Sequence, residues 1–343
     1  MTSVTELVIQ HLGEHGEVEV INLSRGDAAR RRSWKAVRSL RQLQATFSIL
    51  LSRQTGAIYI ALNSGPAIAL DCVLLGAARL RSRHVFAHHH SFSYLSRPLP
   101  LMRLLYAIGN EQLYDVVLCS SMRERLELHY GRSNAIVVTN PVETVAQGSV
   151  GERRSSSLVL GHLANLSREK GIVAVIETFE LCRQRGDDVY LHLAGPFADQ
   201  ATERIVLDAV SRWPGRIAYR GPVYRDAKTT FYEGIDVFLY PTRYPVEAQP
   251  LVILESLGAG TVVMSVDRGC IQDLCTDSEA ISLFDVDRFP EEASVALAEL
   301  LSAPSRVQRL RQLAKDESRR LAEQSQSQLR FLVSAMRQAP RLK

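Results

Sequence analysis

Short apolar runs alternate with helix-like segments along the whole chain. Residues 57–62 and 84–89 are expected to be strands, and residues 66–80 between them have helical spacing. Residues 18–23 have a strand pattern as well. Because parallel strands of one sheet need a crossover, which is usually a helix, this order predicts an α/β fold with parallel sheets covered by helices on both faces.

Length and composition allow two such domains. A chain of 343 residues with 46% hydrophobic and 23% charged residues can bury two sizeable cores. Residues 147–157 are small, polar and charged without periodicity, so they are the predicted linker. A second Rossmann-like unit is expected to begin at Leu158.

The chain lacks the patterns of an exported or membrane-spanning protein. No apolar stretch of about 18 residues occurs, and the first residues lack a basic segment followed by a long apolar run. The net charge of +4 is mild, and no nucleic-acid-binding module is recognisable. We therefore expect a cytoplasmic protein without a nucleic-acid partner.

Two glutamates surround one expected helix start. Glu247 lies in the loop before it and Glu255 lies inside it, while Pro250 suits the first helical position and Gly260 the end. The free N–H groups and the positive dipole end of such a helix favour a diphosphate. A carboxylate such as Glu255 can accept hydrogen bonds from two vicinal hydroxyls of a ribose. The alternative is an exposed loop acid and a solvated helix acid.

The two glutamates, followed by a short apolar helix, a glycine and an apolar strand at residues 261–264, resemble the signature of the retaining glycosyltransferases of family 4. These enzymes have the GT-B architecture, in which a cleft separates two Rossmann-like domains. The resemblance extends from about residue 58 to about residue 283. Its other motifs follow in the family's order at residues 165–171, 191–195, 217–223 and 236–242, with weaker ones at 115–121 and 137–142.

The resemblance implies a role for each part of the chain. Residues 1–146 would be the acceptor-binding domain, and residues 158–320 would bind the nucleotide sugar. Residues 321–343 would form a C-terminal helix that crosses back to the first domain, chiefly through residues 328–336. The family's first strand is missing, because residues 2–7 already have the pattern of a helix start.

The resemblance also implies roles for the site residues. Glu247 would contact the donor sugar, and Glu255 would hold the ribose. Lys170 and the helix start would stabilise charge on the leaving diphosphate, an electrostatic role that needs no metal or other cofactor. The other candidates for donor binding lie in the same loops and are Asn165, Arg168, Gly195, Val223, Gln249, Pro250, Leu251 and Val252.

Three consecutive histidines, His88, His89 and His90, stand at the end of the strand expected at residues 84–89. Ligands of open α/β sheets bind beyond the carboxyl ends of the strands, and family members carry a functional histidine at an equivalent place. His90 is therefore the first candidate for a catalytic role, and His88 and His89 are candidates on the acceptor side. The alternative is a cluster that is partly core and partly solvated.

Residues 30–41 combine several cations with a tryptophan in one expected helix. An apolar face continues from them at helical spacing through Leu40, Leu43, Phe47 and Leu50. Such a basic amphipathic helix is suited to an anionic membrane surface, which would make the protein peripheral on the inner face of the membrane. The alternative is a solvated surface helix.

The expected function is transfer of a hexosyl-type sugar from a nucleoside-diphosphate sugar to a hydroxyl of a glycan or lipid-linked acceptor, in cell-surface polysaccharide or glycolipid biosynthesis. The alternative is a non-catalytic relative that binds a nucleotide sugar or a partner. Two departures from the family favour it: the first strand is missing, and Asn165 replaces a phosphate-binding arginine. Residues 248–250 also replace the family's Gly-Phe-Gly, but they would still leave backbone N–H groups at the helix start. A Rossmann oxidoreductase is disfavoured, because no strand is followed by Gly-x-Gly-x-x-Gly.

Overall fold

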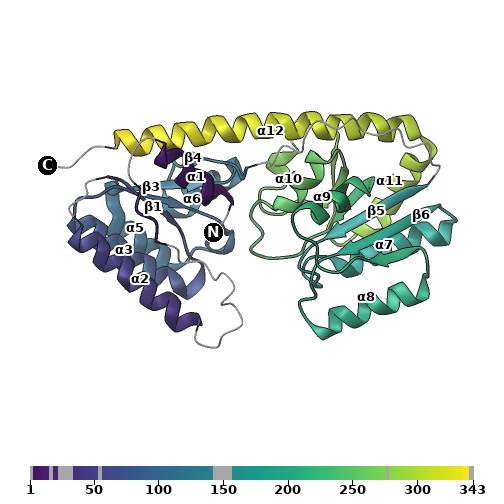
Figure 1. Cartoon of the computed structure of the whole chain (residues 1–343), viewed down its shortest axis with the longest axis horizontal. Helices are drawn as coiled ribbons and strands as arrows, with labels where there is room; N and C mark the ends of the chain where they lie inside the picture. Colours follow the sequence, from purple (N-terminus) through teal and green to yellow (C-terminus); the bar gives the residue numbers. More distant parts are fainter. Residues whose placement is uncertain are drawn as a thin grey trace. The chain divides into compact units, whose positions relative to one another are not determined.

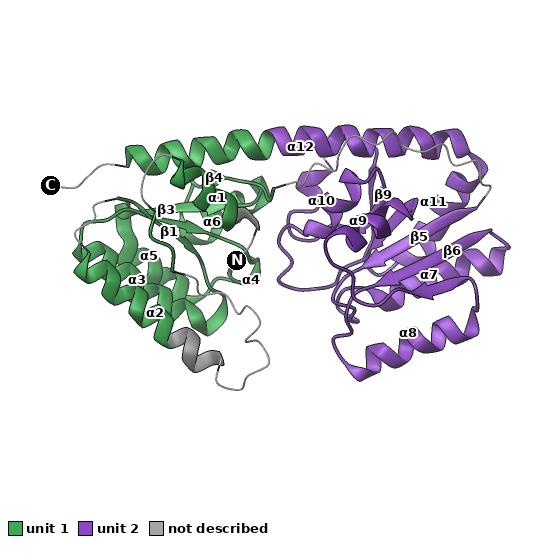
Figure 2. Ribbon diagram, viewed as in Figure 1, with its two compact units in different colours: residues 1–141, 324–343 green, residues 142–323 purple. Residues whose placement is uncertain are grey.

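The structure is a computed structural model, and it describes residues 3–14, 18–21, 34–52, 56–141, 157–275 and 278–339. The chain divides into two compact units, one of residues Met1–Pro141 with Gln324–Lys343 and the other of residues Val142–Glu323 (Figure 2). Residues 147–156 of the predicted linker lie outside the described residues.

The first unit contains a sheet of four parallel strands in the order β1-β2-β3-β4. Strands β1, β3 and β4 are labelled in Figure 1. All four residues of β2 are buried, as expected for an inner strand of a parallel sheet. The strands are β1 (Ile58–Ala61), β2 (Val85–His88), β3 (Leu113–Val117) and β4 (Ile136–Val137). The helices are α1 (Ser3–Gly13), α2 (Trp34–Leu51), α3 (Ile68–Leu80), α4 (Ser93–Ser96), α5 (Pro100–Gly109) and α6 (Ser120–Tyr130), with short 3-10 turns η2 (Gly65–Ala67) and η3 (Asn110–Gln112).

The prediction of a strand at residues 18–23 is wrong for residues 18–21, the part of this segment that the structure describes. Residues 18–21 form no strand, and they pair with none of the described strands. Val20 and Ile21 are exposed. An apolar pattern is not sufficient for a strand, because a strand also needs a neighbour that completes its backbone hydrogen bonds.

The second unit contains a sheet of six parallel strands in the order β10-β9-β8-β5-β6-β7. The α/β class with two parallel sheets, expected from the sequence, is thereby confirmed. The strands are β5 (Leu158–Leu163), β6 (Val189–Ala194), β7 (Ile217–Tyr219), β8 (Val237–Tyr240), β9 (Val262–Val266) and β10 (Ile281–Phe284). The helices are α7 (Ile172–Arg185), α8 (Gln200–Arg212), α9 (Asp226–Glu233), α10 (Leu251–Gly258), α11 (Phe289–Ser302) and the first part of α12 (Pro304–Gln338), with the 3-10 turn η4 (Gln272–Leu274).

Helix α12 contributes to the cores of both units. In the second unit, Arg311 donates to Asp236 at 2.7 Å, and both side chains are buried. Asp236 also accepts a hydrogen bond from the backbone N–H of Val159, so one carboxylate connects α12, β8 and β5. Because removing one partner of a buried ion pair leaves a desolvated charge, this contact fixes the start of α12 against the sheet.

The last part of α12 packs against the first unit. The side chain of Gln328 accepts hydrogen bonds from the backbone N–H and the hydroxyl of Thr139, at 2.9 and 3.0 Å. Ser325 donates to the carbonyl oxygen of Thr139 at 3.0 Å. These polar contacts accompany a shared apolar core made of Val8, Phe86, Val116, Val138, Leu329, Leu332, Val333 and Met336.

The prediction of a helix in the basic segment, residues 30–41, is confirmed for residues 34–41, which belong to α2. Residues 30–33 lie outside the described residues. The helix packs against α3 and buries Ala45 and Ile49. The exposed apolar residues of α2 share one face at helical spacing and are Leu40, Leu43, Phe47 and Leu51. In the described part of the chain, no helix is long and apolar enough to span a bilayer.

Candidate functional site

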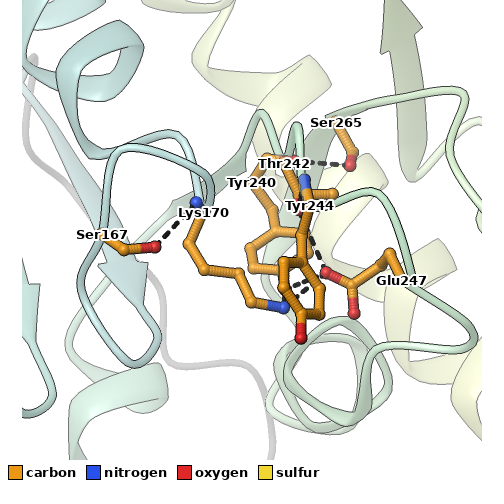
Figure 3. A network of polar contacts seen from close by, with 7 residues as sticks. All are labelled: Ser167, Lys170, Tyr240, Thr242, Tyr244, Glu247 and Ser265. Atoms are coloured by element: carbon orange, nitrogen blue, oxygen red, sulfur yellow. Dashed lines mark hydrogen bonds and ion pairs between the residues drawn. The ribbon is translucent and has the colours of Figure 1, made fainter. Parts of the chain in front are cut away.

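Lys170 and Glu247 meet at one edge of the sheet in the second unit (Figure 3). Lys170 lies in the loop between β5 and α7, and Glu247 lies in the loop between β8 and α10. Because β5 and β8 are parallel neighbours, the loops that follow them lie at the same, carboxyl-terminal edge. The Nζ atom of Lys170 lies 2.6 Å from Oε2 of Glu247. The structure thus brings together two of the three residues expected to be catalytic.

The same oxygen of Glu247 accepts two further hydrogen bonds. The hydroxyls of Tyr240 and Thr242 donate to Oε2 at 2.9 and 3.0 Å. Burial and the nearby Glu247 charge raise the pKa of Tyr240 well above its ordinary value, so its hydroxyl remains a donor. Lys170 Nζ also lies 4.4 Å from the ring centre of Tyr244, within cation–π distance. Glu247 is therefore a buried carboxylate whose charge is balanced and whose position is fixed.

Two glycines allow the loops of this cluster to approach closely. Gly171 has a φ of +89°, and a Cβ atom there would lie 2.3 Å from the carbonyl oxygen of Pro241. Gly269 has a φ of +64°, and a Cβ atom there would lie 2.4 Å from the carbonyl oxygen of Glu247. Any side chain at either position would displace the loop, which explains why Lys170 is followed by glycine.

Helix α10 begins one residue later than expected, because Pro250 is its N-cap and Leu251 its first residue. The N–H of Ile253 donates to the carbonyl oxygen of Pro250 at 3.2 Å. Leu251 and Val252 occupy the first turn, where helical N–H groups lack intrahelical acceptors and the dipole is positive. Gly260 lies beyond the helix end with a φ of +74°. The start of α10 remains a candidate site for a diphosphate.

Glu255 is held by two donors from α9. Lys228 Nζ lies 2.5 Å from Oε1, and the Tyr232 hydroxyl donates to Oε2 at 3.0 Å. Burial and the Glu255 charge raise the pKa of Tyr232 well above its ordinary value, so its hydroxyl also remains protonated. Each oxygen of Glu255 therefore accepts one hydrogen bond.

The remaining donor-site candidates lie in loops of the same unit. Asn165 and Arg168 are exposed in the loop after β5, Val223 is half-buried after β7, and Gln249 is buried before α10. Gly195 has a φ of +117°, and a Cβ atom there would lie 1.8 Å from a carbonyl oxygen of the loop after β5. Only glycine fits that position.

In the first unit, His89 is part of a buried polar network. Its Nδ1 lies 3.0 Å from the Tyr94 hydroxyl, and its Nε2 lies 3.0 Å from Oδ1 of Asp115. Arg132 donates to the other oxygen of Asp115 at 2.7 Å. Burial alone would raise the pKa of Asp115, but the hydrogen bonds and charges of His89 and Arg132 outweigh it and lower the pKa. Both ring nitrogens of His89 are thus engaged within the unit.

His88 and His90 lie together, with ring centres 4.2 Å apart. Burial lowers the pKa of His88 well below its ordinary value and that of His90 to about 4, so both rings are neutral at pH 7. Burial also raises the pKa of Tyr59, whose hydroxyl lies 2.6 Å from Nδ1 of His88. Within the described part of the chain, the buried Nε2 atoms of both histidines have no hydrogen-bond partner. Each of these two rings thus has one buried nitrogen whose hydrogen-bonding capacity the described residues leave unused.

One Asp-x-Asp triplet, Asp285-Val286-Asp287, occurs in the chain. Oδ1 of Asp285 accepts the backbone N–H groups of Asp287 and Arg288 at 2.8 and 3.1 Å, immediately before α11. Asp287 pairs with Arg243 at 2.7 Å. Both carboxylates thus have local structural partners. Among the described residues, no group of three or more His, Cys, Asp or Glu side chains could hold a metal ion.

Several residues of these clusters had no role assigned from the sequence. Tyr240 is the last residue of β8 and Thr242 follows two positions later, and the hydroxyls of both reach Glu247. Lys228 and Tyr232 are four positions apart and share a face of α9. These spacings were readable, but nothing in the sequence connected them with a particular glutamate.

Residues 157–303 match the family model described as glycosyl transferases group 1. The candidate residues Lys170, Glu247 and Glu255 all fall inside this match. The matched residues lie wholly within the second unit. The match does not single out family 4. No curated protein matches the chain.

Several solved structures share the fold of most of this chain. Anabaena HepE in complex with UDP has a TM-score of 0.70 and 16% identity, over 96% of this chain and 89% of that one. A glycosyltransferase from Rickettsia africae has a TM-score of 0.65 and 11% identity, over 97% and 88%. The pneumococcal O-GlcNAc transferase GtfA, in complex with UDP and GlcNAc, has a TM-score of 0.60 and 13% identity, over 77% of this chain and 54% of that one. The likeness shows that the two sheets belong to a GT-B fold.

Proposed function

We propose that this chain is a retaining glycosyltransferase that moves a hexosyl group from a nucleoside-diphosphate sugar to a hydroxyl of a glycan or lipid-linked acceptor. The observation that supports this most is the ion pair of Lys170 with Glu247, because both residues lie within the match to the glycosyltransferase family model and Glu247 is in the loop that leads into α10. HepE has been solved with UDP and with UDP-glucose, which makes UDP-sugars the first donors to test.

In this proposal, Lys170 and the first turn of α10 bind the diphosphate. When the bond to the sugar breaks, negative charge grows on the diphosphate, and a fixed cation and a helix N-terminus stabilise that charge without reorganisation. The ion pair with Glu247 holds Lys170 in place before the donor binds. This electrostatic role requires no metal or other cofactor.

The two glutamates have separate roles in the proposal. Glu247 contacts a hydroxyl of the donor sugar, and Glu255 accepts hydrogen bonds from the ribose. In the first unit, His90 and His88 contact the sugar or the acceptor, because neutral imidazoles offer one donor and one acceptor nitrogen each. No carboxylate is assigned as a covalent nucleophile.

We also propose that the protein acts at the inner face of a membrane, on a lipid-linked acceptor of polysaccharide or glycolipid biosynthesis. Two observations support this: the cations of residues 30–41, and the exposed apolar face of α2 formed by Leu40, Leu43, Phe47 and Leu51. Apolar side chains at a lipid interface add burial to the attraction between cations and acidic headgroups.

Vesicle sedimentation tests the membrane contact. Arg30, Arg31 and Arg32 changed together to Gln, or Phe47→Gln, should release the protein from acidic vesicles, and high salt should mimic the first change because it screens charge. Leu128→Gln is the matched control, because Leu128 is exposed on α6. Wild-type protein that stays in solution with acidic vesicles would remove the membrane from the proposal.

The alternative is a relative that binds a nucleotide sugar without turning it over. Asn165, in the place of a phosphate-binding arginine, favours this alternative, because one fewer cation then assists Lys170 in binding the diphosphate. Thermal-shift measurements with a panel of nucleoside-diphosphate sugars come first, because a ligand at 100 times its Kd adds about 2.7 kcal/mol to the free energy of unfolding.

A turnover measurement distinguishes an active glycosyltransferase from a relative that only binds the nucleotide sugar. Wild-type protein with its best donor and a simple glycoside acceptor should release nucleoside diphosphate, and NMR of the product should show the same anomeric configuration as the donor. Binding without release in the presence of diverse acceptors would support the non-catalytic relative, and an inverted product would contradict retention.

A further inference from the structure

Helix α9 presents two donors to the carboxylate of Glu255. Lys228 and Tyr232 are four residues apart, one helical turn, so both side chains face α10. The lysine ammonium lies 2.5 Å from Oε1, and the tyrosine hydroxyl donates to Oε2 at 3.0 Å. One donor on each oxygen fixes the plane of the carboxylate as well as its position.

This arrangement leaves acceptor capacity on both oxygens. An ionised carboxylate can accept about four hydrogen bonds, two on each oxygen. Lys228 and Tyr232 take one each, and no other described residue donates to Glu255. The side chain of Glu255 is 26% exposed, so the remaining positions are open to a ligand. Two acceptor positions on neighbouring oxygens match a pair of vicinal hydroxyls.

Lys228 also balances the charge of Glu255. Glu255 is only a few residues into α10, roughly 6 Å along the axis from the first residue. An unpaired carboxylate at that distance would repel a diphosphate at the helix start, because both are negative. The ammonium of Lys228 cancels this charge while leaving the carboxylate able to accept hydrogen bonds.

We propose that Lys228 and Tyr232 are positioning residues that orient Glu255 toward the 2′- and 3′-hydroxyls of the donor ribose. The proposal rests on the function proposed above and adds a determinant of ribose recognition from α9. The consequence is a preference for ribose over deoxyribose, because Lys228 should contribute most to nucleotide affinity when both ribose hydroxyls are present.

Binding of UDP and 2′-deoxy-UDP, measured by calorimetry, tests this role. ADP and GDP with their 2′-deoxy forms serve if uridine nucleotides do not bind. In Lys228→Met, affinity for the ribose form should fall roughly 5–10-fold, the size of one ordinary hydrogen bond, because Glu255 is misoriented and not removed, and affinity for the deoxy form should fall less. The preference for ribose over deoxyribose should therefore shrink.

Two further variants make the result specific. Lys228→Arg keeps the cation and should retain most of the ribose preference. Thr230 lies on the same helix, and among the described residues its hydroxyl bonds only to the carbonyl oxygen of Asp226. Thr230→Ala should therefore change neither affinity. Melting curves confirm that each variant is folded.

The outcomes separate this proposal from the one on which it rests. If wild-type protein binds nucleoside diphosphates but Lys228→Met weakens both forms equally, or binds the ribose form more tightly, the positioning role is overturned and the proposed function stands. If wild-type protein binds none of the nucleoside diphosphates, the proposed function fails and this role fails with it.

Discussion

Glu247 and Glu255 belong to one short segment of the chain, yet the protein holds them in different ways. Three donors, from Lys170, Tyr240 and Thr242, converge on the single oxygen Oε2 of Glu247. On Glu255 the donors are divided, with one on each oxygen. The side chain of Glu247 is 10% exposed and that of Glu255 is 26% exposed.

The difference indicates what each carboxylate can bind. Among the described residues, no donor reaches Oε1 of Glu247, so this glutamate offers one unengaged oxygen and suits a single hydroxyl. Glu255 offers one remaining position on each of its two oxygens and suits a pair of hydroxyls. The protein thus prepares two chemically identical side chains for two different contacts by the placement of their donors.

The largest expected effect is on turnover. Glu247→Ala should lower turnover by about 10²–10³-fold, the range seen when a contact formed in the transition state is removed. Affinity for UDP should be no weaker than in the wild type, because the change releases the charge of Lys170 toward the diphosphate. Steady-state rates and calorimetry check this, and a parallel loss of UDP affinity would contradict the separation of the two roles.

The second effect concerns the stability of the second unit at acidic pH. His162 is buried, its Nδ1 lies 2.8 Å from the carbonyl oxygen of Leu239, and its ring stacks on Tyr240. Burial lowers its pKa to about 4, from 6.5 in the unfolded chain. The unfolded state therefore binds a proton more readily than the folded state. Because of this, the contribution of His162 to the free energy of unfolding is fully present above pH 6.5 and falls by about 3 kcal/mol as the pH drops to 4.

Replacing His162 isolates this contribution. His162→Gln can still donate to Leu239 but does not titrate, so its free energy of unfolding should decrease about 3 kcal/mol less than the wild type's between pH 6.5 and pH 4. Urea unfolding is followed by Trp213 fluorescence in a Trp34→Phe background, since the chain has two tryptophans and Trp213 lies in the second unit. An unchanged pH dependence would show that His162 is not held neutral.

The third effect is on nucleotide affinity. Glu255→Ala should weaken UDP binding by about 1.5–3 kcal/mol, the typical cost of a lost hydrogen bond to a charged group. Turnover at saturating donor should change less than in Glu247→Ala, because the ribose contact is present before and during the reaction. Equal UDP affinity in a folded Glu255→Ala protein would remove this residue from the site.

The smallest effects come from the two tyrosines. Tyr240→Phe and Tyr232→Phe each remove one hydroxyl donor from a glutamate, at about 0.5–1.5 kcal/mol. We expect Tyr240→Phe to lower turnover and Tyr232→Phe to weaken UDP binding, so the matched pair reproduces the comparison on a smaller scale. If both variants lower turnover alone, or both weaken UDP binding alone, the two glutamates share one role.

Much of the fold was determined by the sequence. Apolar runs at residues 57–62, 84–89 and 237–240 mark strands that the structure contains, because local hydrophobic periodicity reports which residues a strand or helix can bury. Residues 18–21 show where that reasoning stops. They have an apolar strand pattern without pairing, since a neighbouring strand is not a local property.

The sequence also determined which glutamates and which lysine to consider, through Glu247, Glu255 and the Lys170-Gly171 pair. Only the tertiary structure decided their partners. Lys170 and Glu247 are separated by 77 positions and meet because β5 and β8 are neighbours in the sheet, and Lys228 reaches Glu255 across 27 positions from a different helix. Strand order and helix packing are set by the burial of the whole core, so no spacing along the chain encodes which donor reaches which oxygen.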